Sequence, residues 1–172
     1  AAFAGCTTGF VSVVDLPMED TEAPSAVWTS YIGGNGLSST LTSVRVSNAV
    51  IVLAGTFEQA SGPQAPPHAR GPLVLPATLR RGSYMVGKPF RAGHGMTLEA
   101  PEWGHASSFV AVYDAATGTL LRATVLQTTP LAGMNTGIDA LPFLSLDAIA
   151  VDQGSIALCG HTNGAGVLAA AG

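Results

Sequence analysis

The sequence predicts an all-β protein made of short antiparallel strands in repeated units. Three observations carry this prediction. Charged residues make up only 10% of the chain, while 47% of the residues are hydrophobic. The apolar runs have the length of strands and are rich in Val, Ile, Thr and aromatic residues. These runs also recur along the chain, and each time glycine or aspartate follows at the same relative position.

The first repeated pattern is an apolar strand that ends in a small residue, a glycine and a polar turn. It occurs at Gly5, Gly55 and Gly160. Before the second and third copies lies another short strand, at residues 41–46 and 147–152. Because each pair of strands is joined by a tight turn, the pattern predicts a hairpin that is used more than once.

The second repeated pattern is an apolar strand that begins with Phe-Val and ends with aspartate. It occurs at residues 10–15 and 109–114 and is followed by further strands at 27–32 and 120–126. Between the second pair, Gly118 is expected to supply the positive φ that a tight hairpin turn requires.

Together these patterns define a unit of four antiparallel strands in about 50 residues, which is typical of a β-propeller blade. We letter the strands A (such as 42–46), B (50–54), C (109–113) and D (121–126). The chain then reads B-C-D, A-B, C-D and A-B, with a poor C strand expected at 167–171. It is expected to start and stop inside a blade and to form an incomplete ring.

A Pro-rich insertion interrupts the middle blade between its B and C strands. Residues 61–76 are expected to run as an irregular loop over the surface, and residues 78–90 and 96–98 to form a small hairpin. Removal of residues 58–106 is expected to leave the blades folded. The expected organisation is blades, insertion and further blades, at residues 1–56, 57–107 and 108–172.

Three stretches resemble the SBBP family of bacterial seven-bladed β-propeller repeats, namely residues 28–34, 108–118 and 148–163. A repeat of that family has a strand ending in Val-Asp, a strand ending in Gly-x-Thr, a Phe-Val-x-x-x-Asp strand and a Trp-x-Thr-x-x-Gly-Gly strand. The resemblance skips the insertion. It implies a propeller, often extracellular or at the cell surface, and no particular reaction.

The chain is short for a closed propeller. Outside the insertion it holds roughly two and a half blades, whereas propellers close with about four to eight. An open piece exposes sheet faces and edges. We therefore expect the remaining blades to come from a longer polypeptide, which the sequence favours, or from other chains.

One group in the insertion has spacing that a metal site would use. Three of its members lie three residues apart, which would align them on a helix, but Pro101 and Gly104 oppose a helix there. A solvated loop is the expected reading, and no metal and no cofactor are predicted. The group consists of His94, Glu99, Glu102 and His105.

The insertion also holds the residues expected to bind a partner. Trp103 is the best candidate for an exposed aromatic anchor. Arg80 and Arg81 form a basic pair that is a second candidate for partner contact. Trp28, on a D strand, is expected to pack between blades instead.

Three aspartates stand at strand ends, namely Asp15, Asp114 and Asp152. Each is expected to accept backbone N–H groups of the following turn. A calcium site would need six to eight oxygen ligands and is disfavoured by the sparse acidic residues. Cys6 and Cys159 are expected to be free thiols or small buried residues.

The remaining composition excludes several functions. A net charge of −4 with a single lysine, Lys88, argues against nucleic-acid binding. No apolar run approaches the length of a membrane span. No nucleophile elbow or phosphate loop is present.

The predicted function is therefore a non-catalytic propeller scaffold or protein-interaction module. Its partner would be another protein or the remaining blades of the same propeller. Two alternatives stay open: an adhesion or carbohydrate-binding propeller, and part of a propeller enzyme whose active site lies in other blades. Low charge and abundant Thr, Ser and Gly favour an extracellular or cell-surface setting.

Overall fold

The computed structural model describes residues 8–17, 23–34, 37–47, 49–59, 72–79, 96–98, 106–129, 142–152 and 154–171. Every helix or strand assigned within these ranges is a β-strand, and all paired strands run antiparallel. The prediction of an all-β fold is confirmed. In the same ranges there is no helix with the length and apolar character needed to cross a membrane.

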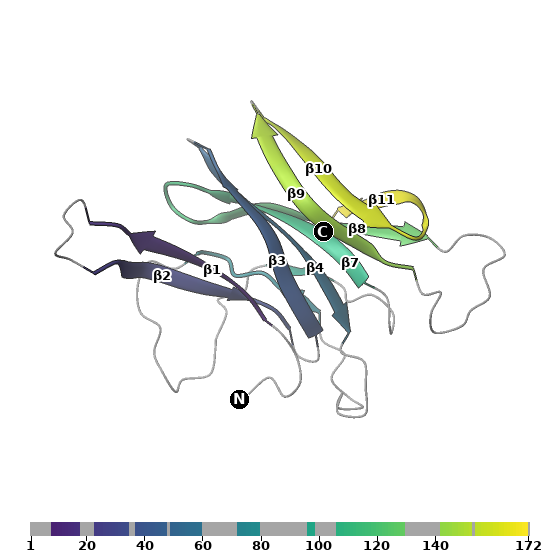
Figure 1. The fold of residues 1–172 in the computed structure, drawn as a ribbon, viewed down its shortest axis with the longest axis horizontal. Coiled ribbons are helices and arrows are strands. Elements are labelled where there is room, and N and C mark those ends of the chain that lie inside the picture. The colour runs from purple at the N-terminus through teal and green to yellow at the C-terminus, as the bar shows by residue number, and fades with distance from the viewer. Residues whose placement is uncertain are drawn as a thin grey trace.

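The largest element is a five-stranded sheet, which we call the central sheet (Figure 1). Its strand order is β11-β8-β7-β4-β3, and none of the sheets is closed. The strands β3, β4, β7 and β8 follow one another in chain order, as expected for an A-B-C-D meander. The five strands are β3 (Leu37–Val46), β4 (Val50–Gln59), β7 (Ala106–Asp114), β8 (Leu120–Thr129) and β11 (Ala165–Ala171).

Three two-stranded sheets accompany the central sheet. The N-terminal hairpin pairs β1 (Gly9–Asp15) with β2 (Ser25–Ile32), and the C-terminal hairpin pairs β9 (Leu144–Asp152) with β10 (Ser155–Thr162). The third, within the insertion, pairs β5 (Leu73–Val74) with β6 (Thr97–Leu98). Both hairpins consist of the strand pairs that the sequence predicted.

The central sheet lies between two apolar cores, one on each face. Along β4, Leu53 and Phe57 belong to one core, while Val52 and Ala54 belong to the other. Because successive side chains of a strand point to opposite faces, the sheet is buried on both sides. The first core includes Val11 of the N-terminal hairpin and leucines of the insertion, and the second includes β9 of the C-terminal hairpin. The N-terminal hairpin, the central sheet and the C-terminal hairpin thus stack in that order, and only the last strand, β11, returns to the central sheet.

The two strands at the middle of the sheet carry nearly continuous apolar runs for this reason. On β7 every residue from 107 to 113 is buried. Phe109 and Phe57 meet edge to face, with ring centroids 6.0 Å apart. The Phe109 ring also lies over Gly55, where an added Cβ would stand 2.9 Å from the ring and collide with the Thr40 carbonyl oxygen. Glycine is therefore required at this point of closest approach.

The two A-B hairpins share an irregularity. In β3–β4 the register shifts between Leu41 and Ser43, opposite Gly55, and in β9–β10 it shifts at the equivalent place, opposite Gly160. A Cβ on Gly160 would collide with the Ser145 carbonyl oxygen, just as one on Gly55 would collide with a carbonyl. The glycine of the sequence motif therefore marks a β-bulge in both hairpins.

The two C-D hairpins also share a bulge. The register of β1–β2 shifts between Val13 and Val14, and that of β7–β8 shifts between Val112 and Tyr113. These positions are equivalent when the two Phe-Val motifs are aligned. The turn after β7 contains Gly118 with φ of 71°, as the sequence predicted.

The insertion is part of the core where the structure describes it. Strand β4 runs on to Gln59 and β7 begins at Ala106, so the ends of the 57–107 segment extend the central sheet. The prediction of a surface loop is wrong for residues 72–76, because Leu73 and Leu75 are fully buried. The described partner of residues 97–98 is 73–74, while most of 78–90 lies outside the described residues.

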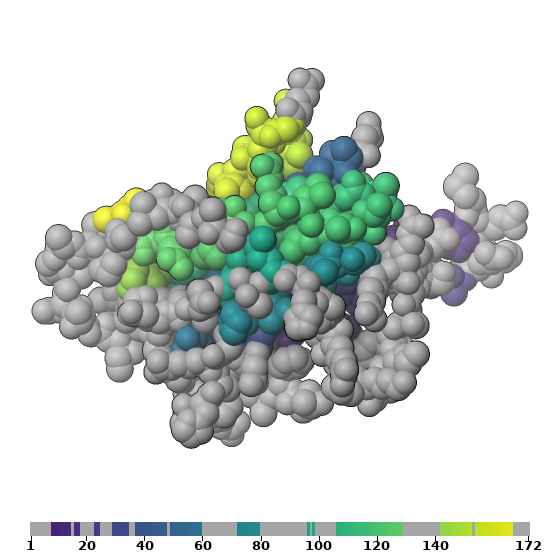
Figure 2. Space-filling view, turned by 180° about the vertical axis from the view of Figure 1, so that it is seen from behind, coloured from purple at the N-terminus to yellow at the C-terminus, as the bar shows by residue number. Residues whose placement is uncertain are grey.

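Residues 77–79 attach the insertion to the turn after β7. The Leu79 N–H donates to the Gly118 carbonyl, and the Leu120 N–H donates to the Ala77 carbonyl, each over 2.8 Å. Figure 2 shows this segment, in teal, against the green of β7 and β8.

The last strand departs from the expected arrangement. The sequence placed residues 167–171 as the C strand that follows β10, but β11 pairs antiparallel with β8 instead. The pairing extends from Ala165 opposite Thr129 to Ala171 opposite Thr124. Strand β11 adds to the outer edge of β8 and ends the central sheet, and within the described residues β10 pairs with β9 only.

Candidate functional site

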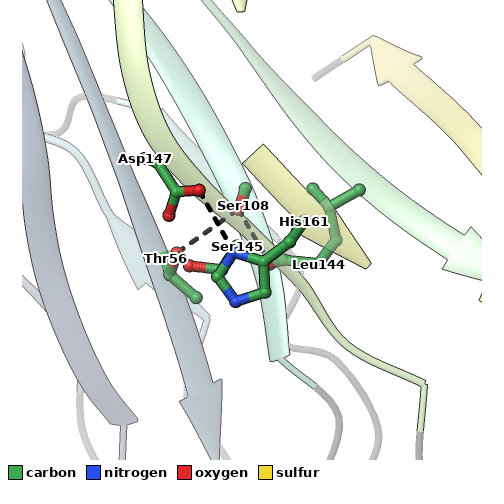
Figure 3. A network of polar contacts seen from close by, with 6 residues as sticks. All are labelled: Thr56, Ser108, Leu144, Ser145, Asp147 and His161. Carbon is green, nitrogen blue, oxygen red and sulfur yellow. Dashed lines mark hydrogen bonds and ion pairs between the residues drawn. The ribbon is translucent and has the colours of Figure 1, made fainter. Parts of the chain in front are cut away.

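A network of polar side chains lies where the C-terminal hairpin meets the central sheet (Figure 3). The Thr56 hydroxyl of β4 lies 3.4 Å from both the Ser108 and the Ser145 hydroxyls. Ser108, which is fully buried on β7, donates to the Leu144 carbonyl over 2.9 Å. The network thereby joins β4, β7 and β9 by hydroxyl groups where the apolar core ends.

His161 and Asp147 lie beside this network on β10 and β9. The His161 Nδ1 lies 3.2 Å from the Asp147 Oδ2, and both side chains are more than half exposed. Asp147 is the extra residue of the β9 bulge, which places its carboxylate on the same side as His161. The imidazole ring meets the Phe143 ring edge to face at 5.5 Å.

The backbone of Phe143 is held from both sides. Its N–H donates to the Asn163 Oδ1 over 2.8 Å, and its carbonyl accepts the Thr162 hydroxyl over 2.7 Å. The turn between β10 and β11 therefore fixes the start of β9, and with it the ring that supports His161.

This arrangement includes a serine, a histidine and an aspartate, so it can be tested against a catalytic triad. In a triad the acid binds Nδ1 and the nucleophile binds Nε2. Here Asp147 does bind Nδ1, but the hydroxyl of Ser145 is hydrogen-bonded to Thr56. Among the described residues no hydroxyl is hydrogen-bonded to Nε2 of His161. The network consequently has the properties of a contact that joins strands. Because both side chains are exposed, the contact between His161 and Asp147 contributes at most about 1 kcal/mol to stability.

The turn after β7 confirms the role predicted for Asp114. Its Oδ1 accepts the N–H groups of Ala116 and Thr117, at 3.0 and 2.7 Å, and the Thr117 hydroxyl at 2.8 Å. The Thr117 N–H, followed by the Thr117 hydroxyl and the Ala116 N–H, holds the pKa of Asp114 below its usual range. The ionised carboxylate therefore stabilises the hairpin turn.

Replacement of Asp114 by alanine is expected to lower the melting temperature at neutral pH. Because the folded-state pKa is lowered, the stabilisation is complete above the ordinary value of 3.8 and is lost as the pH falls through the folded-state value. The difference in melting temperature between the native chain and Asp114→Ala should thus shrink in acid, toward the value that the neutral acceptor alone supplies. Asp114→Asn, which keeps an acceptor but does not titrate, is the control; a difference that persists unchanged into acid contradicts the role of the charge.

Tyr113 lies next to this turn but points into the first core. Its side chain is fully buried, and its hydroxyl has no hydrogen-bond partner among the residues that the structure describes. Burial raises the pKa of Tyr113, so the phenol stays neutral at any physiological pH. It serves as a core residue rather than as an acid or a base.

The site residues predicted from sequence lie outside the described residues. This holds for the group with metal-like spacing, His94, Glu99, Glu102 and His105, and for the partner-binding candidates Trp103, Arg80 and Arg81. Within the described part of the chain, no three His, Cys, Asp or Glu side chains cluster as metal ligands would. Cys159 is a free, exposed thiol, as one of its two predicted states required, and Cys6 lies outside the described residues.

Sequence reasoning did not single out the hydroxyl network. A signal was available, because Thr56 and His161 each directly follow the glycine of the repeated motif. Aligning the motifs therefore marks one position beside each bulge. The sequence could not indicate that Ser108 and Ser145 approach that position, because they lie on other strands and meet it only after the layers stack.

A related contact joins the N-terminal hairpin to the central sheet. The hydroxyl of Ser39, on β3, accepts the Gly9 N–H at 3.1 Å and donates to the Ile32 carbonyl at 2.6 Å. Ser39 is almost fully buried, so this contact replaces water for two backbone groups.

Comparisons with protein-family models, with curated proteins and with solved structures found no match to this chain.

Proposed function

We propose that this chain is a non-catalytic β-propeller module that works as a scaffold or protein-interaction surface within a larger polypeptide or assembly. The proposal rests on one observation. Two successive units of the repeat pack against each other at two places in this chain, and the contacts at both places involve equivalent positions. The first step leads from the N-terminal hairpin to the central sheet. The second leads from the central sheet to the C-terminal hairpin.

The equivalence of the two steps can be followed residue by residue. Gly9 directly precedes the Phe-Val motif of β1, and Ser108 directly precedes that of β7. Ser39 lies 16 residues before Gly55, and Leu144 lies 16 residues before Gly160. The contact of Gly9 with Ser39 at the first step is matched by that of Ser108 with Leu144 at the second.

This regularity supports a propeller because radial repetition of small sheets requires each sheet to pack on the next in the same way. The shared bulges of the A-B and C-D hairpins support it as well. The fold by itself implies no reaction. The hydroxyl groups at both steps bind backbone or other hydroxyls, which is what a scaffold needs.

The insertion is the part of the chain that we propose binds a partner. Leu79 and Leu98 are buried in the first core, so the segment between them starts and ends at fixed points. Loops held by a rigid framework are the usual carriers of binding residues. Arg80 directly follows Leu79, and Trp103 lies between Leu98 and the start of β7.

The proposal is tested with a chain in which Trp103, Arg80 and Arg81 are replaced by alanine. The native chain is immobilised, and proteins retained from extracts and culture medium of the source cells are quantified by mass spectrometry. A partner should lose more than about tenfold in retention on the triple variant, since aromatic and arginine anchors dominate binding.

The matched control is Arg122→Ala, which removes an exposed arginine of β8 outside the insertion. A partner retained by the native chain and by this control, but not by the triple variant, supports the proposal. Equal retention by all three chains contradicts it.

A further inference from the structure

We propose that Asn163 is a site of spontaneous deamidation, and that hydrogen bonds to the backbone of Phe143 control when it reacts. The site is the pair of Asn163 and Gly164, in the turn between β10 and β11 (Figure 1). This covalent change in the chain itself is separate from the proposed function. Water is the only other reactant that it needs.

The reaction joins two neighbouring groups of this turn. The backbone nitrogen of Gly164 attacks the side-chain amide carbon, Cγ, of Asn163, so that an N–Cγ bond forms and the Cγ–Nδ2 bond breaks. The proton that the Gly164 nitrogen gives up leaves with Nδ2 as ammonia, and a five-membered succinimide ring remains. Water then opens the ring at one or the other carbonyl, which leaves an aspartyl or an isoaspartyl residue.

Glycine is the residue that best permits this ring closure. It has no Cβ to hinder the approach of its nitrogen, and its backbone adopts conformations that other residues avoid. The chain has two Asn-Gly pairs, at positions 35–36 and 163–164. The first pair lies outside the described residues. Around the second pair, the structure shows what holds each reacting group.

Phe143, just before β9, organises the contacts of both groups. Its N–H donates to the Oδ1 of Asn163 over 2.8 Å. Its carbonyl accepts the Thr162 hydroxyl over 2.7 Å, and the oxygen of the same hydroxyl accepts the Gly164 N–H over 3.1 Å. We call these three hydrogen bonds the Phe143 clamp.

The Phe143 clamp slows the reaction in the folded chain. The bond from the Phe143 N–H fixes the orientation of the Asn163 amide, and the bond to Thr162 holds the proton that the Gly164 nitrogen must lose. Asn163 and Gly164 are half-buried and Thr162 is exposed, so water reaches the turn when it opens. Deamidation therefore follows the local opening of this turn, which costs far less free energy than global unfolding.

The product changes the Phe143 clamp in a way that depends on how the ring opens. An aspartyl residue keeps an oxygen at the place of Oδ1, so the Phe143 N–H keeps its acceptor. An isoaspartyl residue has one extra backbone atom, and its carboxylate is attached directly to Cα. The isoaspartyl product therefore releases the start of β9, and with it the Phe143 ring that packs against His161.

Thr162→Val tests the Phe143 clamp, because it keeps the branched side chain and removes only the hydroxyl. Thr162→Ser is the matched control, since it keeps the hydroxyl. The folded chains are aged at neutral pH, and the Asn, Asp and isoaspartyl forms of the peptide that contains position 163 are quantified by liquid chromatography and mass spectrometry. Thr162→Val should deamidate about three- to tenfold faster than the native chain, since one net hydrogen bond shifts an opening equilibrium by about that factor. Thr162→Ser should keep the native rate.

Two references accompany these variants. The native chain unfolded in guanidinium chloride should deamidate at Asn163 at least about tenfold faster than the folded chain, because no opening step precedes the reaction. The Asn-Gly pair at 35–36 is the internal reference, and its rate should be the same in the folded native chain and in both variants.

Four outcomes overturn the inference. These are an unmodified Asn163 even in the unfolded chain, equal rates at Asn163 in the folded and unfolded chains, equal rates in Thr162→Val and Thr162→Ser, and a rise in Thr162→Val that occurs equally at both Asn-Gly pairs. The last would show that the substitution loosens the whole chain and that the Phe143 clamp has no role of its own.

Discussion

Deletion of residues 60–105 is expected to unfold the central sheet. The segment contributes four leucines that are at most 2% exposed and belong to the first core, namely Leu73, Leu75, Leu79 and Leu98. Removing one buried leucine side chain costs about 2–5 kcal/mol. Four such losses reach or exceed the roughly 5–15 kcal/mol that stabilises a whole domain. The deleted chain should show no cooperative thermal transition by circular dichroism.

A single substitution gives the same test in a chain that still folds. Leu75→Ala should lower the free energy of unfolding by about 2–5 kcal/mol in a denaturant titration. Leu121→Ala is the control, because Leu121 is 55% exposed on β8, and its effect should stay within about 0.5 kcal/mol. A deleted chain that melts cooperatively at the native temperature would restore the sequence-based expectation that the blades fold without the insertion.

Replacement of Phe109 by alanine is expected to lower the free energy of unfolding by about 3–5 kcal/mol. The ring is fully buried, meets Phe57 edge to face and covers Gly55. Its loss leaves a cavity at the centre of the sheet, where both neighbouring strands prevent collapse. Chemical denaturation monitored by circular dichroism measures the loss.

The repeat offers an unusually close control for this substitution. Phe10 occupies the equivalent position in the N-terminal hairpin but is 62% exposed. Phe10→Ala should change the free energy of unfolding of the dilute chain by less than about 0.5 kcal/mol. Equal effects of the two substitutions would contradict the placement of Phe109 in the core and of Phe10 at the surface.

Much of the strand pattern was predictable from particular residues. The Phe-Val and glycine motifs predicted the strands β1, β4, β7 and β10, because short apolar runs that are rich in β-branched residues and lie between turns usually form strands. The pairing of Asp114 with its own turn was predictable because it depends on residues two and three positions away. Local interactions of this kind need no knowledge of the rest of the fold.

The placement of β11 and of residues 72–76 was not predictable in the same way. The strand β11 was expected beside β10 because it follows β10 in the chain, but pairing depends on which edge is within reach. Leu73 and Leu75 lie in a Pro-rich stretch that resembles a surface loop, yet their side chains fill the first core. The candidate residues of the insertion, from Arg80 to His105, lie outside the described residues.

The sequence by itself determined that this chain is all-β, where most of its strands lie, and which glycines and aspartates punctuate them. These features depend on strand periodicity and turn chemistry, which act over a few residues. Only the tertiary structure decided that three layers stack, that the insertion completes a core, and that the Gly9–Ser39 and Ser108–Leu144 contacts join successive layers at matching positions. Those contacts join residues far apart in the chain, and they exist only once each sheet has buried its apolar face against the next.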